Sequence, residues 1–120
     1  MDGSATVEEL KQRVREFCEA RDWDQFHTPK DLAIGIITEA SELLELFRFL
    51  SDEEGAILLD DPIRRKEIEA ELADVLFFVV RFAQRFSIDL DDAIRQKMDL
   101  TGQKYPVERC RGSNVKYTRL

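Results

Sequence analysis

Two short acidic motifs are the residues of this chain best suited to chemistry. Glu39 and Glu42 stand three residues apart, and Glu71 and Asp74 repeat that spacing further on. On a helix this spacing places two side chains on neighbouring turns of one face, so two facing helices could bring four carboxylates together. Carboxylate oxygens are hard ligands of the kind that Mg²⁺, Mn²⁺ or Ca²⁺ takes. The spacing therefore points to a cation site built from oxygen ligands.

Each acidic motif lies at the edge of an apolar helical face. Glu39 falls beside the apolar face of its segment on a helical wheel, and Glu71 takes the same place on the next. Most acid pairs on helices are solvated surface, but a carboxylate held against apolar surface is costly unless a cation or donors compensate it. The repeated offset favours a bound divalent cation. The two faces consist of Leu32, Ile36, Ala40, Leu43, Phe47 and Leu50, and of Ile68, Leu72, Val75, Val79, Phe82 and Phe86.

Helical periodicity and capping signals predict an all-α fold. We expect helices at about residues 6–22, 29–50, 62–86 and 89–104. Thr28-Pro29 and Asp61-Pro62 each place a capping side chain before a proline at the first helical position, which indicates a helix start. Residues 51–61 are expected to be a connecting loop with at most one helical turn, and residues 106–120 an irregular basic tail. No stretch has a strand pattern, so the prediction is a four-helix bundle.

Length and composition restrict the class of protein. The 120 residues suit one domain, residues 1–120, with a core over about 6–105 and the tail over 106–120. A net charge of −7 disfavours binding to nucleic acid polymers. No apolar run approaches the roughly 20 residues of a membrane span. Cys18 reads as a core residue and Cys110 lies in the tail, and neither fits a metal or redox spacing, which suits a reduced, cytoplasmic setting.

Other metal-site types do not fit the sequence. A di-iron carboxylate bundle uses Glu-x-x-His on two helices, whereas the single histidine, His27, lies outside both acidic segments. An EF-hand is excluded because the stretch around Asp89 lacks the required glycine and twelfth-position glutamate. What remains is a carboxylate cation site. Mg²⁺ usually binds through a few carboxylates together with substrate phosphates, which points to phosphoryl or nucleotidyl chemistry.

The same residues resemble a known family. Glu-x-x-Glu followed by Glu-x-x-Asp is similar to the signature of the MazG-like, all-α nucleotide pyrophosphohydrolase superfamily. The segments RDWDQFHTPKDLA, ELLELF, ELADVL, KMD, QKYPV, RGS and KYT resemble its dCTP pyrophosphatase branch. The resemblance covers about residues 15–118. It implies hydrolysis of a nucleoside triphosphate between the α and β phosphates, which gives the monophosphate and pyrophosphate.

The resemblance also implies roles for individual residues. Glu39, Glu42, Glu71 and Asp74 would hold Mg²⁺, with Mn²⁺ as a substitute, and a water would attack phosphorus in line. Glu45, one turn beyond Glu42, is the candidate for orienting or deprotonating that water, and a solvated surface role is its alternative. The substrate contacts implied by the matching positions are Trp23, Phe26, His27, Phe49, Phe78, Lys97, Tyr105, Arg111 and Lys116.

Four departures from the branch leave the preferred base open. Phe49 stands where the dCTP enzymes have tryptophan and Phe78 where they have tyrosine, while Val14 replaces a histidine and Thr101 an asparagine. Lost hydroxyl and amide groups matter because sites that hydrogen-bond a ligand discriminate more strongly than apolar ones. The substrate is then dCTP, a modified dCTP, dUTP or several dNTPs.

Two further expectations concern assembly and function. The family's homotetramer, a dimer of dimers, implies that this chain with its eight phenylalanines is also a homo-oligomer. From another class, the chain could be a catalytically silent helical interaction module. The four acids speak against the silent module, because such a scaffold has no reason to keep them at the edge of its core.

Overall fold

All the regular secondary structure in residues 2–120, the part of the chain that the computed structural model describes, is helical. The first residue of the predicted domain lies outside the described residues. The helices are α1 (Val7–Glu19), α2 (Pro29–Glu45), α3 (Asp52–Leu58), α4 (Pro62–Arg85), α5 (Leu90–Lys104) and α6 (Val107–Cys110), with two 3₁₀ turns, η1 (Asp24–Phe26) and η2 (Tyr117–Arg119). The predicted all-α class is confirmed. Within the described residues, no helix is both long and apolar enough to span a bilayer.

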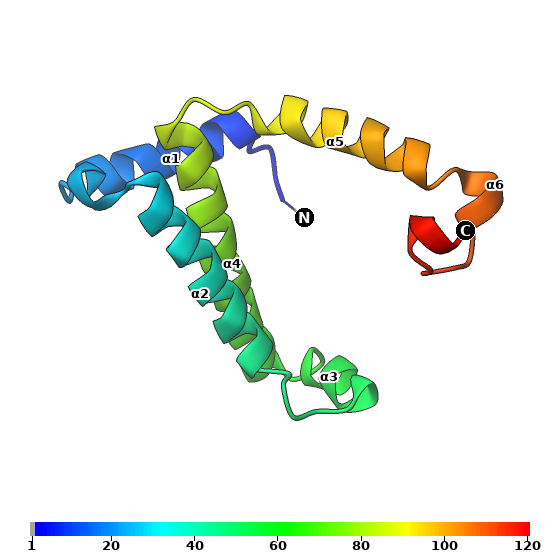
Figure 1. The fold of residues 1–120 in the computed structure, drawn as a ribbon. Helices are drawn as coiled ribbons and strands as arrows, with labels where there is room; N and C mark the ends of the chain where they lie inside the picture. Colours follow the sequence, from blue (N-terminus) through cyan, green and yellow to red (C-terminus); the bar gives the residue numbers. More distant parts are fainter. Residues whose placement is uncertain (1) are drawn as a thin grey trace. The chain divides into compact units, whose positions relative to one another are not determined.

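The chain forms two compact units, one ending at Ser87 and the other spanning Ile88–Leu120. In the first unit α4 packs against both α1 and α2, and α2 and α4 run side by side in opposite directions (Figure 1). The second unit contains α5, α6 and η2. Both acidic motifs lie in the first unit, one on each member of the α2–α4 pair.

The predicted helix starts agree with the structure because capping is a local property. The Thr28 hydroxyl accepts a hydrogen bond from the Asp31 amide, and Pro29 follows at the first helical position. Asp61 accepts from the Ile63 amide before Pro62 in the same way. These caps fix where α2 and α4 begin. The acids ten or so residues further on therefore have a defined height along each helix.

The segment between α2 and α4 is more helical than predicted. Residues 52–58 form α3, a seven-residue helix rather than a loop. Ser51 accepts from the Glu54 amide, and the Glu54 carboxylate accepts from the Ser51 amide, which makes a reciprocal cap that the sequence analysis missed. α2 also ends at Glu45, before the predicted Leu50, and α3 lies against the ring of Phe47. A Cβ on Gly55 would lie 3.3 Å from that ring.

The tail is more regular than predicted, although residues 111–116 have no helix. After Pro106 the chain forms α6 and, further on, η2. The Tyr105 hydroxyl accepts a hydrogen bond of 3.1 Å from the Tyr117 amide, and the two rings pack edge to face. Cys110 donates to the Tyr105 carbonyl. Side-chain contacts between residues twelve apart therefore order a segment that has too little periodicity to reveal itself in sequence.

The core of the first unit is small and differs from the predicted one on α4. Cys18 and Leu32 are fully buried, as their positions on the predicted apolar faces indicated. On α4 the buried residues include Val80 and Ala83, whereas Leu72, predicted for the core face, is 56% exposed. This difference arises because α4 is apolar on two sides, and only packing shows which side meets α1 and α2.

Candidate functional site

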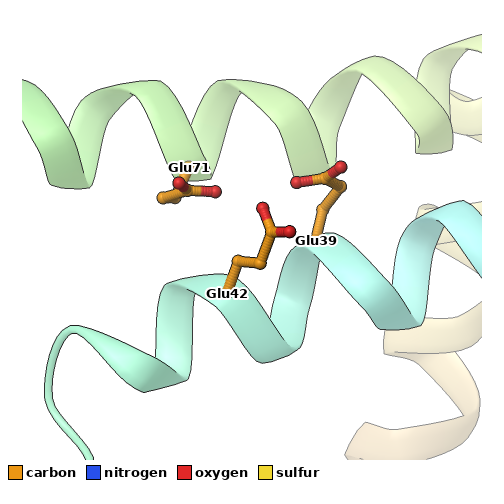
Figure 2. A group of neighbouring side chains, drawn as sticks. All are labelled: Glu39, Glu42 and Glu71. Carbon is orange, nitrogen blue, oxygen red and sulfur yellow. The ribbon is translucent and has the colours of Figure 1, made fainter.

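Three carboxylates meet between α2 and α4. Glu39 and Glu42 project from α2 toward Glu71 on α4 (Figure 2). One oxygen from each of the three lies within 4.8 Å of the others. The predicted convergence of the two acidic motifs is therefore present in the fold for three of its four acids. Asp74 is exposed and lies outside this group, although its charge acts on both Glu39 and Glu71.

Two of the carboxylate oxygens are buried without a hydrogen-bond partner. Oε2 of Glu39 and Oε2 of Glu71 are both shielded from solvent and accept no hydrogen bond from any residue that the structure describes. A buried acceptor left unpaired costs roughly 1–3 kcal/mol, and more when it is charged. Such orphaned oxygens are uncommon in native proteins and usually indicate a functional role or an ion. The two atoms belong to opposite helices, so one cation could compensate both.

The pKa values of Glu39 and Glu71 are both raised. A side-chain hydrogen bond with Glu42, burial and the neighbouring negative charges raise the pKa of Glu39 to about 7. Burial and then the charge of Glu42 raise the pKa of Glu71. Like charges disfavour the ionised form unless an opposite charge joins them. The arrangement therefore suits a divalent cation, and an oxygen-only set of this kind fits Mg²⁺ or Mn²⁺.

Glu45 lies apart from the three-acid cluster. It is the last residue of α2, is exposed, and pairs with Arg48 at 3.3 Å. Surface pairs of this kind contribute little to stability. Its carboxylate is accessible to a water, and its role in orienting one stays a prediction.

The predicted aromatic contacts lie in the connection between α1 and α2. Trp23 and Phe17 pack edge to face with centroids 5.6 Å apart, and Trp23 lies 6.1 Å from the His27 ring. Trp23 is partly exposed, so its ring both covers Phe17 and faces solvent. Phe26 is 59% exposed and available for contact. The loop thus combines packing with an open aromatic surface.

The residue that sequence reasoning missed is Arg81. It is fully buried on α4, and its Nε donates to Nδ1 of His27 at 2.8 Å. Its other nitrogens donate to Asp24 and to Gln84. The bond to Arg81 lowers the pKa of Asp24, while burial and the charge of Arg81 lower that of His27. The available signal was an arginine standing inside the apolar run of residues 75–83.

The two phenylalanines predicted to contact the base have different surroundings. Phe78 on α4 is partly buried against the backbone of α2 at Gly35, where an added Cβ would come within 2.5 Å of its ring. Phe49 follows α2, is 83% exposed, and has Arg48 above its ring at 4.9 Å. Phe78 therefore packs within the helix pair, Phe49 offers an open aromatic surface, and the contact of either ring with a base stays a prediction.

The remaining predicted contacts belong to the second unit. Lys97 lies on α5, Arg111 and Lys116 flank α6 and η2, and all three are exposed. Tyr105 follows the last residue of α5, and its hydroxyl accepts a hydrogen bond from the Tyr117 amide. The contacts of these four residues with a substrate stay predictions.

The fold and the acid cluster together define an all-α protein with a group of three carboxylates that could hold a cation. A model of the MazG-like family matches residues 34–120. The chain is 42% identical to mouse dCTP pyrophosphatase 1 over 115 residues, which is 96% of this chain and 68% of that protein. It is 38% identical to the human protein of the same name over the same span.

A solved structure has a similar fold. The crystal structure of a pyrophosphatase from Archaeoglobus fulgidus is similar with a TM-score of 0.79 at 36% identity, covering 88% of this chain and 97% of that one. The chain belongs to the MazG-like family. The resemblance to the dCTP pyrophosphatase branch that the sequence motifs indicated is confirmed by these matches.

Proposed function

We propose that the protein hydrolyses a deoxynucleoside triphosphate, with dCTP or a modified dCTP preferred, to the monophosphate and pyrophosphate in a Mg²⁺-dependent reaction. The reaction class is that of a nucleoside triphosphate pyrophosphohydrolase, as the family match and the named relatives support. The observation that carries the proposal is the pair of buried, unpartnered oxygens on Glu39 and Glu71, because it is the feature of the α2–α4 pair that needs a cation.

The acids have distinct parts in this proposal. Glu39, Glu42 and Glu71 would hold the cation, and Asp74, exposed one turn beyond Glu71, would complete the set from the solvent side. When bound, Mg²⁺ neutralises charge on the phosphate oxygens and the leaving pyrophosphate. Glu45 would orient or deprotonate the attacking water. Its exposed carboxylate can reach solvent, as that role requires.

The base would lie on the aromatic loop. Trp23 and Phe26 offer exposed ring surface, and His27 offers a ring N–H. Phe49, Lys97, Tyr105, Arg111 and Lys116 are further proposed contacts. dUTP or a broad range of dNTPs is the alternative substrate, because Phe78 packs against Gly35 with no hydroxyl to bind a base. A catalytically silent helical interaction module is the alternative that is not an enzyme.

Homo-oligomerisation, as a tetramer, is part of the proposal. The face of α4 that carries Leu72 and Leu76 forms a shallow apolar depression of about 440 Å³, and both residues are at least half exposed. Exposed apolar patches of this kind often mark protein–protein contacts. A second copy that covers the face would remove it from water. A cytoplasmic location is proposed on the two unpatterned cysteines, which are both free.

The test is pyrophosphate release from dCTP, 5-methyl-dCTP, dUTP, dTTP and dATP, each with and without Mg²⁺. We expect release that requires the metal and is fastest with the cytosine nucleotides. Glu42→Gln and Asp74→Asn should each lower kcat at least 100-fold while the helical circular dichroism signal is kept. Release from every nucleotide would favour the broad enzyme. No release from any of them, together with no Mg²⁺-dependent rise in Tm, would favour the silent module.

A further inference from the structure

Arg81 is a buried cation with every nitrogen in use. It lies on α4 with no exposed surface. Its Nε donates to His27 at 2.8 Å, one terminal nitrogen donates to Gln84 at 2.6 Å, and the other donates to the Asp24 carboxylate. Burying a guanidinium is costly, and removing one partner of such a set is more costly still. A buried arginine that only filled space would be replaced by an apolar residue at little loss, so this network invites a functional explanation.

Two of the three partners lie at the ends of η1. Asp24 is the first residue of that turn, and His27 follows its last residue. In the sequence they are 57 and 54 residues from Arg81. One side chain of α4 therefore fastens both ends of the turn that follows Trp23. Within the loop, Asp22 takes a positive φ of 53°, and Gln25 donates to its carbonyl and carboxylate. The aromatic loop is consequently held at a fixed place on the first unit.

The bond from Arg81 also decides which nitrogen of His27 carries the proton. A guanidinium can only donate, so Nδ1 of His27 must accept and cannot be protonated. The ring proton of the neutral imidazole is then on Nε2. Burial and the charge of Arg81 lower the pKa of His27, a shift in the direction that favours the neutral ring. His27 therefore offers a ligand one donor, the Nε2 N–H.

The spacing of Arg81 from the acids along α4 is compatible with a ligand the size of a nucleotide. Arg81 follows Asp74 by seven residues and Glu71 by ten on α4. At 1.5 Å per residue these separations are about 10 Å and about 15 Å along the helix. A nucleotide whose phosphates lie at the acids carries its base away from them by the length of the sugar and the α phosphate. The aromatic loop lies toward that end of the helix pair, because His27 immediately precedes the cap of α2.

We propose that Arg81 is a positioning residue: it holds His27 beside Trp23 with Nε2–H presented to the acceptor edge of a pyrimidine base. The inference rests on the proposed function and adds a physical reason why one nucleotide base would be preferred. N3 of cytosine accepts a hydrogen bond, whereas N3 of uracil and thymine carries a proton. A fixed donor therefore favours cytosine, and a mismatch would leave two donors facing each other.

The link between Arg81 and His27 can be tested without substrate. His27 is the single histidine of the chain, so ¹⁵N-labelled histidine reports on it alone in an NMR spectrum. In the unaltered protein we expect an unprotonated Nδ1 and a protonated Nε2. Arg81→Met should change the Nδ1 signal and allow tautomer exchange. Arg85→Gln is the matched control, because it removes another positive charge of α4 that acts on His27. It should leave the tautomer fixed.

The choice of base is tested by kinetics. The ratio of kcat/KM for dCTP to that for dUTP should fall at least tenfold in Arg81→Met and equally in His27→Phe, which keeps a ring but loses the donor. If Arg81 acts through His27, the double variant should lose no more than His27→Phe alone. Additive losses would show that Arg81 stabilises the fold without positioning His27. Arg81→Lys, which keeps the buried charge but not the planar set of donors, takes the place of Arg81→Met if that variant does not fold.

The outcomes separate this inference from the proposed function. A protonated Nδ1 in the unaltered protein, or an unchanged Nδ1 signal in Arg81→Met, overturns the role of Arg81 whatever the activity. Equal kcat/KM for dCTP and dUTP in the unaltered protein overturns the proposal that His27 discriminates cytosine from uracil. No pyrophosphate release from any nucleotide overturns the proposed function, and the NMR result still decides the link between Arg81 and His27.

Discussion

Gly35 on α2 lies directly beneath the ring of Phe78 on α4. A Cβ at position 35 would come within 2.5 Å of Cδ1 and 2.6 Å of Cε1 of that ring. The two helices approach closely here because one of them has no side chain. The acids Glu39 and Glu71 lie about one to two turns away on the same pair, so this contact sets the helix separation at which their oxygens meet.

The first prediction follows from that contact. Gly35→Ala gains up to about 1 kcal/mol of helix propensity, but forcing a methyl into a packed interface typically costs about 1–3 kcal/mol. We expect net destabilisation in urea unfolding, together with a weaker Mg²⁺-dependent rise in Tm. Gly102→Ala is the control. Gly102 lies on α5, and a Cβ there would have no atom of the described residues within 4 Å. It should stabilise the protein slightly. A stable Gly35→Ala with unaltered metal response would contradict this account.

The second prediction concerns pH in the metal-free protein. The pKa of Glu39 is raised from 4.5 to about 7 by Glu42, burial and the neighbouring acids. The folded state therefore holds a proton that the unfolded state releases, so the free energy of unfolding should fall as pH rises from about 4.5 to about 7. Urea unfolding across that range, with EDTA present, measures the slope. Glu39→Gln should flatten it, and a slope that survives this substitution must come from other groups.

Added Mg²⁺ should have the opposite pH dependence. A cation binds the ionised carboxylates, so its stabilisation should be larger at pH 7.5 than at pH 5. The same unfolding series with the metal present tests this, and an equal effect at both pH values would argue against binding at the acids.

The third prediction concerns Glu45. If its carboxylate orients or deprotonates the water, Glu45→Gln should lower kcat by about 10²–10⁴-fold with KM little changed. Arg48→Gln is the matched control, because it breaks the Arg48–Glu45 pair and keeps the carboxylate. That variant should stay within a few-fold of the unaltered enzyme. Near-normal kcat in Glu45→Gln would leave Glu45 as one member of a surface ion pair.

The fourth prediction concerns the order of the tail. Tyr105→Phe removes the hydroxyl that accepts from the Tyr117 amide, at a local cost of about 1 kcal/mol. Hydrogen exchange at the Tyr117 amide should become faster while α5 keeps its protection. Tyr117→Phe keeps both the ring contact and the amide, so exchange should stay slow. If the tail contacts substrate as proposed, Tyr105→Phe should also raise KM. An unchanged KM would show that the order of the tail does not affect substrate binding.

The fifth prediction concerns assembly. We expect a homotetramer by light scattering, and Leu76→Glu in the apolar depression of α4 should lower the mass, because a buried charge without a partner opposes association. Ile63→Glu is the control on the same helix, since Ile63 is also exposed and lies outside the depression. A monomeric unaltered protein would rule out the proposed tetramer.

The sequence by itself determined the helix starts, the spacing of the acids and the family. Thr28, Asp61 and the prolines after them act within a few residues, so their effect is readable without the fold. The predicted secondary structure was wrong in the segments that lack local periodicity. α3 and the tail are ordered by a reciprocal cap and by the Tyr105–Tyr117 contact, which depend on side chains that a periodicity search does not weigh.

The tertiary structure alone decided which groups meet. Glu39, Glu42 and Glu71 come together while Asp74 lies outside their group, because packing between α2 and α4, of which the Gly35–Phe78 contact is one part, sets how the two helices face each other. Arg81 finds His27 across 54 residues for the same reason. A sequence fixes what each helix carries and where it begins. The angle at which two helices dock, which decides which side chains share one point in space, depends on the sum of many weak contacts between them.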